Sequence, residues 1–300
     1  MMNKEKTLIL LEKDPTNLLS DEYAIKGYSF DFFFKDANVF LRAIRRVWLK
    51  YDLPYKTIWF GSWYHHLDLY DTLIINMNRL TRYTIETVSR KYPKMRIIGW
   101  YWNTIDETNK PICFADNVEY WSFDENDCKK YGFYQNIQYY SCIEDKGNVT
   151  KDTDVYFVGR AKDREEEILS FKRIADQYGL KQEMHIVHEG GELIPYSEVR
   201  KSLRRSLAVL EINKENQVGF TLRVMESLFY GIKLITNNRS IRDSEVYNEN
   251  NIFIIGEDDD KKLVDFIHSP YDHQTDALRD RYSLQQWFNN FDQADLRGEK

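Results

Sequence analysis

The feature that most constrains the fold is an alternation of short apolar runs with segments of helical periodicity. Residues 7–12 and 155–158 are apolar runs of strand length, whereas 164–178 carries apolar residues at every third or fourth position. Strands that alternate with helices are joined by crossovers, which produce parallel sheets covered by helices on both faces. The sequence therefore predicts an α/β protein.

One polar stretch, residues 144–154, interrupts this alternation and lacks any periodicity, so it is predicted to be a linker. Two runs of alternation separated by a linker imply two doubly wound domains. We place them at residues 1–150 and 151–275, with a last helix in 276–300.

The first domain is expected to contain a strand at residues 57–60 and an amphipathic helix at 36–49. Val39, Phe40 and Val47 belong to the apolar face of that helix, and its arginines lie on the other side.

Composition excludes several classes of protein. The net charge of −6 argues against non-specific binding of nucleic acid. No apolar run approaches the ~20 residues that cross a bilayer. Three cysteines without a close pair argue against a disulfide scaffold or a zinc site, and a reducing cytoplasm is the natural location.

Residues 217–238 read as a loop, a helix and a strand. Thr221 can cap the helix through its hydroxyl, and Gly231 follows the last apolar position, where a left-handed residue is favoured. A glycine-containing loop that opens a helix presents unpaired N–H groups and the positive end of a dipole. This segment therefore suits an anionic ligand.

The same segment resembles the nucleotide-sugar site of glycosyltransferases with the GT-B architecture. Gly219, Glu226, Ser227 and Gly231 carry the resemblance. In that family the glutamate holds the ribose hydroxyls of the donor. Retaining members usually have a second glutamate eight residues earlier, where this chain has Val218, so the stereochemistry of transfer stays open.

The resemblance implies two Rossmann-like doubly wound domains that face a cleft, as in bacterial capsule and lipopolysaccharide transferases. Residues 1–150 would bind the acceptor, 151–275 would bind the nucleotide sugar, and the helix in 276–300 would pack back on the first domain. The expected activity moves a sugar from a nucleoside diphosphate to a hydroxyl of a bacterial surface glycan (capsule, lipopolysaccharide or exopolysaccharide). GT-B enzymes generally need no protein-bound metal, and we expect no other cofactor.

Basic residues follow the apolar run that ends near Gly159. Arg160, Lys162 and Arg164 would lie at the carboxyl end of a strand, where cations suit a diphosphate. The alternative is a solvated basic loop.

The remaining donor-site candidates come from the segment described above. Glu226 is the expected ribose contact, although an intrahelical ion pair with Arg223 is the alternative for both side chains. Gln217 and Thr221 are further polar candidates, and ordinary loop and cap chemistry is the alternative for them.

Candidates for the catalytic base are expected in the first domain. His65 and His66 lie in a loop and could deprotonate an acceptor hydroxyl, although paired loop histidines are more often structural. Asp14, just after the first strand, is a carboxylate alternative.

Two other functions fit the same pattern. The chain could be an inactive module that binds a nucleotide sugar or a glycan, or an epimerase that acts on the nucleotide sugar without an acceptor. Peripheral contact with the inner face of the membrane is a further possibility, since one surface of the first domain combines basic and aromatic residues. The alternative is a solvated helix face. These residues are Arg42, Arg45, Arg46, Trp48 and Lys50.

Overall fold

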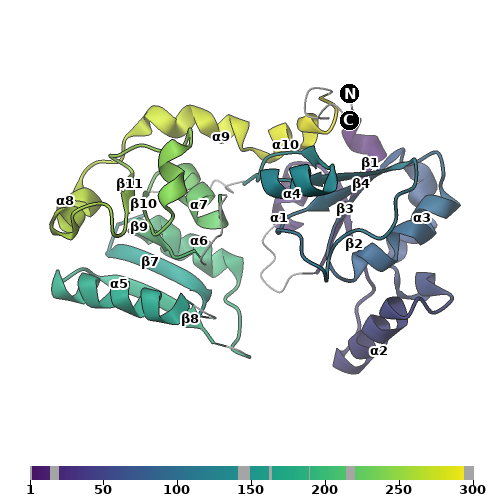
Figure 1. The fold of residues 1–300 in the computed structure, drawn as a ribbon, viewed down its shortest axis with the longest axis horizontal. Coiled ribbons are helices and arrows are strands. Elements are labelled where there is room, and N and C mark those ends of the chain that lie inside the picture. The colour runs from purple at the N-terminus through teal and green to yellow at the C-terminus, as the bar shows by residue number, and fades with distance from the viewer. Residues whose placement is uncertain are drawn as a thin grey trace. The chain divides into compact units, whose positions relative to one another are not determined.

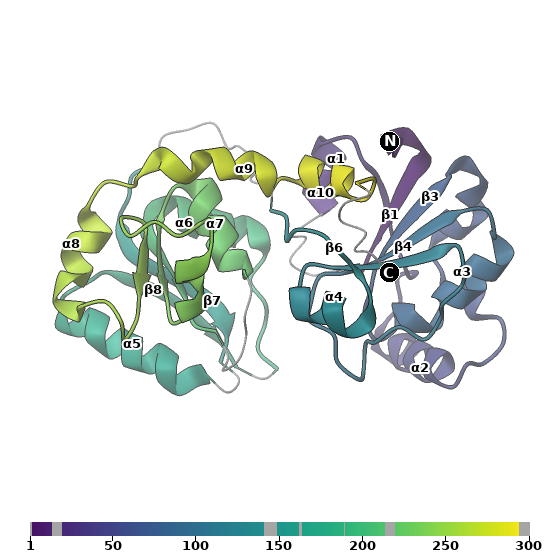
Figure 2. The same ribbon diagram turned by 45° about the horizontal axis from the view of Figure 1, so that its top comes forward.

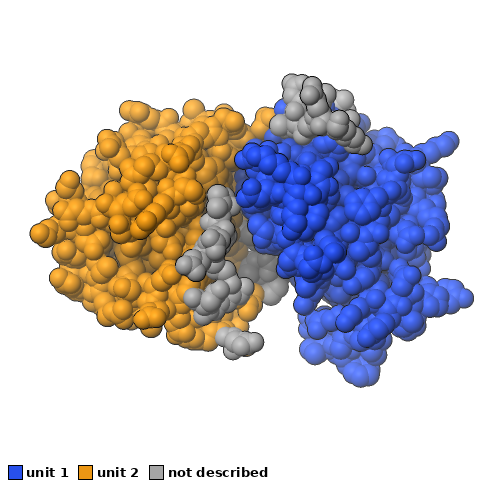
Figure 3. Space-filling view, viewed as in Figure 1, with its two compact units in different colours: residues 1–138, 287–300 blue, residues 139–286 orange. Residues whose placement is uncertain are grey.

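The structure is a computed structural model that describes residues 2–13, 20–140, 149–161, 164–188, 190–213 and 220–293. The chain divides into two compact units, which Figure 3 shows in different colours. Unit 1 comprises residues 1–138 and 287–300, and unit 2 comprises residues 139–286.

Unit 1 is built around a parallel sheet with the strand order β2-β1-β3-β4-β5-β6 (Figure 1). Its strands in the described part of the chain are β1 (Thr7–Leu11), β2 (Ser29–Phe32), β3 (Thr72–Asn76), β4 (Arg96–Tyr101), β5 (Val118–Ser122) and β6 (Tyr134–Gln135). Its helices there are α1 (Ser20–Ile25), α2 (Val39–Lys50), α3 (Ile85–Lys91), α4 (Glu125–Tyr131) and the second half of α10 (Leu284–Asn290).

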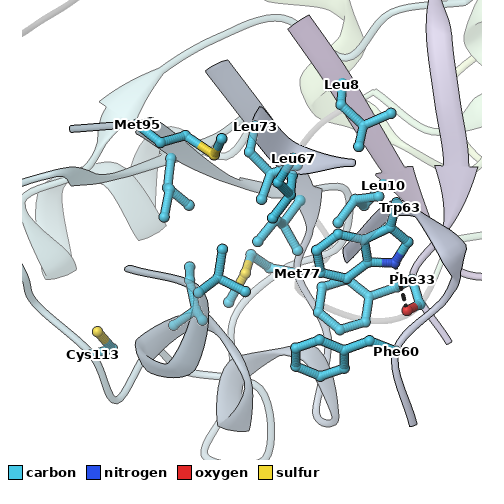
Figure 4. Close-up of a cluster of buried hydrophobic side chains, with 14 of the residues drawn as sticks. Leu8, Leu10, Phe33, Phe60, Trp63, Leu67, Leu73, Met77, Met95 and Cys113 are labelled. Atoms are coloured by element: carbon cyan, nitrogen blue, oxygen red, sulfur yellow. Dashed lines mark hydrogen bonds between the residues drawn. The ribbon is translucent and has the colours of Figure 1, made fainter. Parts of the chain in front are cut away.

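One face of this sheet is covered by an aromatic core (Figure 4). Leu73 of β3 packs there with Phe60 and Trp63, whose rings stack at 5.2 Å between centroids. The indole Nε1 of Trp63 donates a hydrogen bond to the carbonyl oxygen of Phe33 at 2.9 Å, so the buried polar atom has a partner.

Trp287 of α10 and Phe291, which follows the helix, pack on the opposite face. The ring of Trp287 lies 5.7 Å from that of Trp100, and Phe291 lies 5.0 Å from Trp121. Arg96 of β4 donates to the carbonyl oxygen of Phe291 at 2.6 Å, which ties the end of α10 to the sheet.

Two expectations for unit 1 are wrong. Residues 57–60 form no strand, because 57–59 belong to the 3-10 helix Lys56–Trp59 and Phe60 makes only an isolated bridge with Phe34. The neighbours of β1 are β2 and β3. The left-handed residue Tyr55 turns the chain directly before this 3-10 helix. The apolar face of α2 also does not point into the core, since Val39 and Phe40 are 74% and 72% exposed.

Unit 2 repeats the plan with the order β11-β10-β9-β7-β8, again entirely parallel among the described strands. Its strands are β7 (Thr153–Arg160), β8 (Gln182–Val187), β9 (Ser206–Glu211), β10 (Lys233–Thr236) and β11 (Ile252–Ile254). Its helices are α5 (Glu165–Gln177), α6 (Tyr196–Arg205), α7 (Leu222–Tyr230), α8 (Leu263–His268), α9 (Leu278–Arg281) and the first half of α10.

Helices cover both faces of the unit 2 sheet (Figure 2). Phe171 of α5 and Ile267 of α8 belong to the same buried cluster as Phe157 and Leu210 of the sheet. Helices α6 and α7 lie on the other face. The prediction of two Rossmann-like doubly wound domains is confirmed by the parallel strand order of each unit.

The limits of the units differ from those placed on the sequence. Tyr140 belongs to unit 2 because its N–H donates to the carbonyl oxygen of Tyr282 at 2.9 Å, so this unit begins before residue 151. Unit 2 also extends beyond residue 275, since Arg279 donates to the carbonyl oxygen of Leu228 at 2.8 Å.

Candidate functional site

The topology of unit 2 points to the carboxyl ends of its strands as the place where a ligand binds. Strand β7 lies between β8 and β9, so the connections from β7 and β9 leave in opposite directions along the sheet. In doubly wound sheets, ligands bind outside the carboxyl ends of the strands at this switch point. Gly159 and Arg160 end β7, and Glu211 ends β9.

The N-terminus of α7 lies at the same edge. The hydroxyl of Thr221 accepts a hydrogen bond from the Arg223 N–H at 3.1 Å, which makes Thr221 the N-cap as predicted. Gly231 ends the helix in the left-handed conformation, at φ 59°. The helix therefore presents its positive end where the strands finish.

Glu211 joins these elements, and the sequence analysis missed it. Its carboxylate accepts hydrogen bonds from the hydroxyls of Thr221 and Thr236, the latter at 2.5 Å. The side chain is almost fully buried. Burial raises the pKa of the Glu211 carboxyl, while the two hydroxyls and the charges of Arg223 and Arg164 act against that rise. A glutamate ending an apolar strand was the available signal.

Arg164 braces the ends of β7 and β9. Its guanidinium donates to the carbonyl oxygen of Ile212, and its Nε donates to that of Arg160 at 3.2 Å. A Cβ on Gly159 would lie 3.2 Å from Nη2 of Arg164, so a glycine leaves room for this guanidinium. Arg160 is exposed, and its side chain makes no hydrogen bond to the described residues.

Asn213 follows β9 and supplies a second unusual feature. It is only 5% exposed, yet its Nδ2 donates to no described residue. Its backbone is held by Asn237, whose Oδ1 accepts from the Asn213 N–H at 2.7 Å and whose Nδ2 donates back to the Asn213 carbonyl at 3.1 Å. Buried polar groups normally have partners, so this amide marks the edge as a place where a ligand acceptor fits.

Glu226 lies deeper in the unit, within a closed polar network. One carboxylate oxygen accepts from Arg223, and the other accepts from the hydroxyl of Tyr196 at 2.7 Å. The hydroxyl of Tyr196 also lies 2.6 Å from that of Tyr140. Glu226 has no exposed surface, so a ribose could reach its carboxylate only if Arg223 or Tyr196 gave up its hydrogen bond.

The buried charges of Glu226 and Arg223 stabilise each other through direct contact. Burial raises the pKa of the Glu226 carboxyl, and the charge of Arg223 and the Tyr196 hydrogen bond oppose that rise. Burial acts to lower the pKa of Arg223, but the charge of Glu226 prevails and the pKa is raised. Burial also holds the pKa values of Tyr140 and Tyr196 well above their usual range.

The structure brings Gly159, Arg160, Arg164, Thr221 and Arg223 together in unit 2. His65 and His66 belong to unit 1, and both are exposed. The ring of His65 contacts the edge of Tyr64, with 6.0 Å between centroids. Four predicted residues lie outside the described residues, namely Asp14, Lys162, Gln217 and Gly219.

A pocket of about 460 Å³ lies elsewhere in unit 2. Tyr156, Glu183 and His185 line it together with residues of α6. It follows the side of the sheet near β8 and not the carboxyl ends of β7 and β9, so we place the candidate site at the switch point. The described residues contain no group of three or more His, Cys, Asp or Glu that could hold a metal ion.

Comparisons with known proteins leave the family open. No protein-family model matches the chain, and no curated protein does. One similar solved structure is that of a Listeria monocytogenes protein described as a UDP-N-acetylglucosamine 2-epimerase. It has 10% sequence identity and a TM-score of 0.46, and the match covers 96% of this chain and 95% of that one. At this TM-score the match carries no argument, and the fold rests on the sheet topology.

Proposed function

We propose that this protein is a glycosyltransferase that binds the diphosphate of a nucleotide sugar at the switch point of unit 2. It transfers the sugar to a hydroxyl of a bacterial surface glycan. The observation that carries the proposal is the group of donors at one sheet edge. The N-terminus of α7, the exposed Arg160, the braced Arg164 and the side-chain amide of Asn213, which donates to no described residue, all lie there.

These groups suit the charge changes of glycosyl transfer. The acceptor oxygen bonds to the anomeric carbon, the bond from that carbon to the diphosphate breaks, and the diphosphate leaves with the electron pair. The acceptor proton passes to a base. Cations and helix amides that contact the leaving diphosphate stabilise the transition state more than the ground state.

The ribose contact of Glu226 is part of the proposal and requires a rearrangement. Arg223 is 17% exposed in its side chain and pairs with Glu226 through a single helical turn. A bound diphosphate would attract the Arg223 guanidinium, which would release one oxygen of Glu226 for a ribose hydroxyl. Nucleotide binding and the opening of this ion pair would then occur together.

A thermal-shift screen tests the donor site. UDP, GDP, CMP and dTDP, each with its common sugars, are added to the wild type, Arg160→Gln and Arg173→Gln. A ligand in hundredfold excess over its Kd stabilises the folded state by about 2.7 kcal/mol. We expect one nucleotide to stabilise the wild type and Arg173→Gln, and to act less on Arg160→Gln. Arg173 is the control because it is exposed on α5 of the same unit.

Product analysis separates the alternatives once a nucleotide sugar is identified. Acceptor-dependent release of the nucleoside diphosphate supports the transferase. Conversion of the sugar to its epimer without an acceptor would show that the protein is an epimerase and not a transferase. Binding without conversion would leave an inactive nucleotide-sugar module, and no binding by any nucleotide would overturn the donor site itself.

A further inference from the structure

Helix α2 has an arrangement that an ordinary surface helix lacks. Leu49 is fully buried, and Arg45 is nearly so. The Arg45 guanidinium lies 4.4 Å from the centre of the Phe34 ring and donates to the carbonyl oxygen of Lys35 at 3.1 Å. Because Arg45 and Leu49 anchor the helix, its main apolar stripe faces away from unit 1. Figure 1 shows α2 projecting from the body of that unit.

The outward side of α2 carries two parallel stripes with four-residue spacing. One stripe is apolar: it consists of Val39, Ala43, Val47 and Tyr51 at four-residue spacing, together with the adjacent Phe40. Val47 and Tyr51 are 53% and 67% exposed. We call these five residues the apolar stripe. Apolar residues four apart share one helix face, so together they form a continuous exposed surface.

The basic stripe consists of Arg42, Arg46 and Lys50, all exposed. Helix α2 contains no acidic residue, although the whole chain has a net charge of −6. A helix with aromatic and aliphatic residues on one face and cations beside them lies in a membrane interface, with its cations at anionic headgroups.

We propose that α2 docks unit 1 onto an anionic membrane surface. The apolar stripe enters the boundary between headgroups and acyl chains, and the basic stripe contacts phosphate groups. A second copy of the chain is a poorer occupant, because two α2 helices related by two-fold symmetry would bring their basic stripes together. No helix in the described part of the chain is long and apolar enough to cross a membrane.

Co-sedimentation of the full chain with vesicles tests the charge component. Vesicles of equal parts phosphatidylglycerol and phosphatidylcholine should bind the wild type, and pure phosphatidylcholine should bind it far less. The variant Arg42→Gln/Arg46→Gln/Lys50→Gln should lose about a hundredfold in partition coefficient, or about fivefold per charge. The control variant Arg90→Gln/Lys129→Gln/Lys130→Gln removes three exposed charges elsewhere in unit 1 and should bind normally.

The apolar component needs its own comparison. Phe40→Ser should weaken binding to the mixed vesicles roughly tenfold, whereas Phe114→Ser should not, although Phe114 is 74% exposed in the same unit. Both Phe40 and the basic stripe are exposed, so the melting temperatures should stay unchanged. Wild type that does not bind the mixed vesicles would overturn the proposal. So would an equal loss of binding in the control variants, or a change in oligomeric state upon Phe40→Ser.

Discussion

The carboxylate of Glu211 accepts a hydrogen bond from the hydroxyl of Thr221, which joins the carboxyl end of β9 to the N-cap of α7. The same carboxylate accepts from Thr236 at the end of β10. One buried side chain therefore holds three elements at the candidate site. Glu211 therefore helps to fix the position of the helix N-terminus, together with the N-cap Thr221.

Replacing Glu211 with alanine should lower the free energy of unfolding by about 1–3 kcal/mol, because two buried hydroxyls lose their acceptor. Urea unfolding measures this loss. Glu249→Ala is the control, since Glu249 is exposed, and its effect should stay within ~0.5 kcal/mol. Equal losses in the two variants would mean that Glu211 does not organise this edge.

The pH dependence of stability should report the same residue. A carboxyl whose pKa is raised by folding binds its proton more tightly in the folded state, so its stabilising contribution is complete below the unfolded pKa. That contribution is lost as pH rises through the folded pKa. Wild type should therefore lose stability relative to Glu211→Gln as the pH rises above the ordinary pKa of a glutamate, about 4.3. A difference between the two proteins that stays constant with pH would contradict this prediction.

Substitutions of Arg160 and Arg164 should differ in their effects on ligand binding and on stability. Arg160→Gln should raise the Kd of the nucleotide by roughly 10- to 100-fold, the loss of one charged hydrogen bond, without changing the melting temperature. Arg164→Gln should weaken binding and also lower the melting temperature, because its guanidinium holds the carbonyl of Ile212. Isothermal titration and thermal unfolding measure the two effects. Identical behaviour of the two variants would contradict the distinction.

Arg96 should anchor the end of the chain to unit 1. Its side chain is 22% exposed and pairs with Glu119 at 2.7 Å and Asp292 at 3.1 Å. Arg96→Met leaves these carboxylates without a cation and should cost roughly 3–5 kcal/mol. Arg90→Met breaks an exposed pair with Glu86 and should cost at most ~1 kcal/mol. Chemical unfolding measures the free energy lost in each variant. If Arg96→Met costs no more than Arg90→Met, Arg96 does not anchor this segment.

Local patterns predicted most of the fold because strands and helices differ in apolar period. The strands Thr7–Leu11 and Thr153–Arg160 and the helix Glu165–Gln177 agree with the sequence analysis within a few positions. The prediction of a strand at residues 57–60 was wrong because a short apolar run has no period of its own. The left-handed Tyr55 before this run sets the path of the chain. The side of α2 that faces the core was also unpredictable, since Arg45 is buried by a contact with Phe34.

The candidate site was only partly predictable for a related reason. The cap of α7 and the basic residues after β7 are local signals, and sequence alone finds them. Glu211, Asn213 and Thr236 become site residues through strand pairing, in which Thr236 lies opposite Glu211. A single sequence does not contain that register, so these three residues carried no signal beyond their position near the ends of apolar runs.

Glu226 can act as a ribose contact or as the centre of a buried network, and two variants distinguish these roles. Tyr196→Phe removes the hydrogen bond to Glu226 and leaves the carboxylate in place, so it should cost about 1–3 kcal/mol of stability. Its nucleotide Kd should not rise, because the carboxylate stays in place and one of its oxygens becomes available to a ribose hydroxyl. Glu226→Gln should also destabilise the protein, because it leaves Arg223 without its charged partner. If Glu226 holds the ribose, Glu226→Gln should in addition raise the Kd of the nucleotide while leaving that of inorganic diphosphate unchanged. Destabilisation with an unchanged nucleotide Kd would restrict Glu226 to the network, and the ribose would then need another partner.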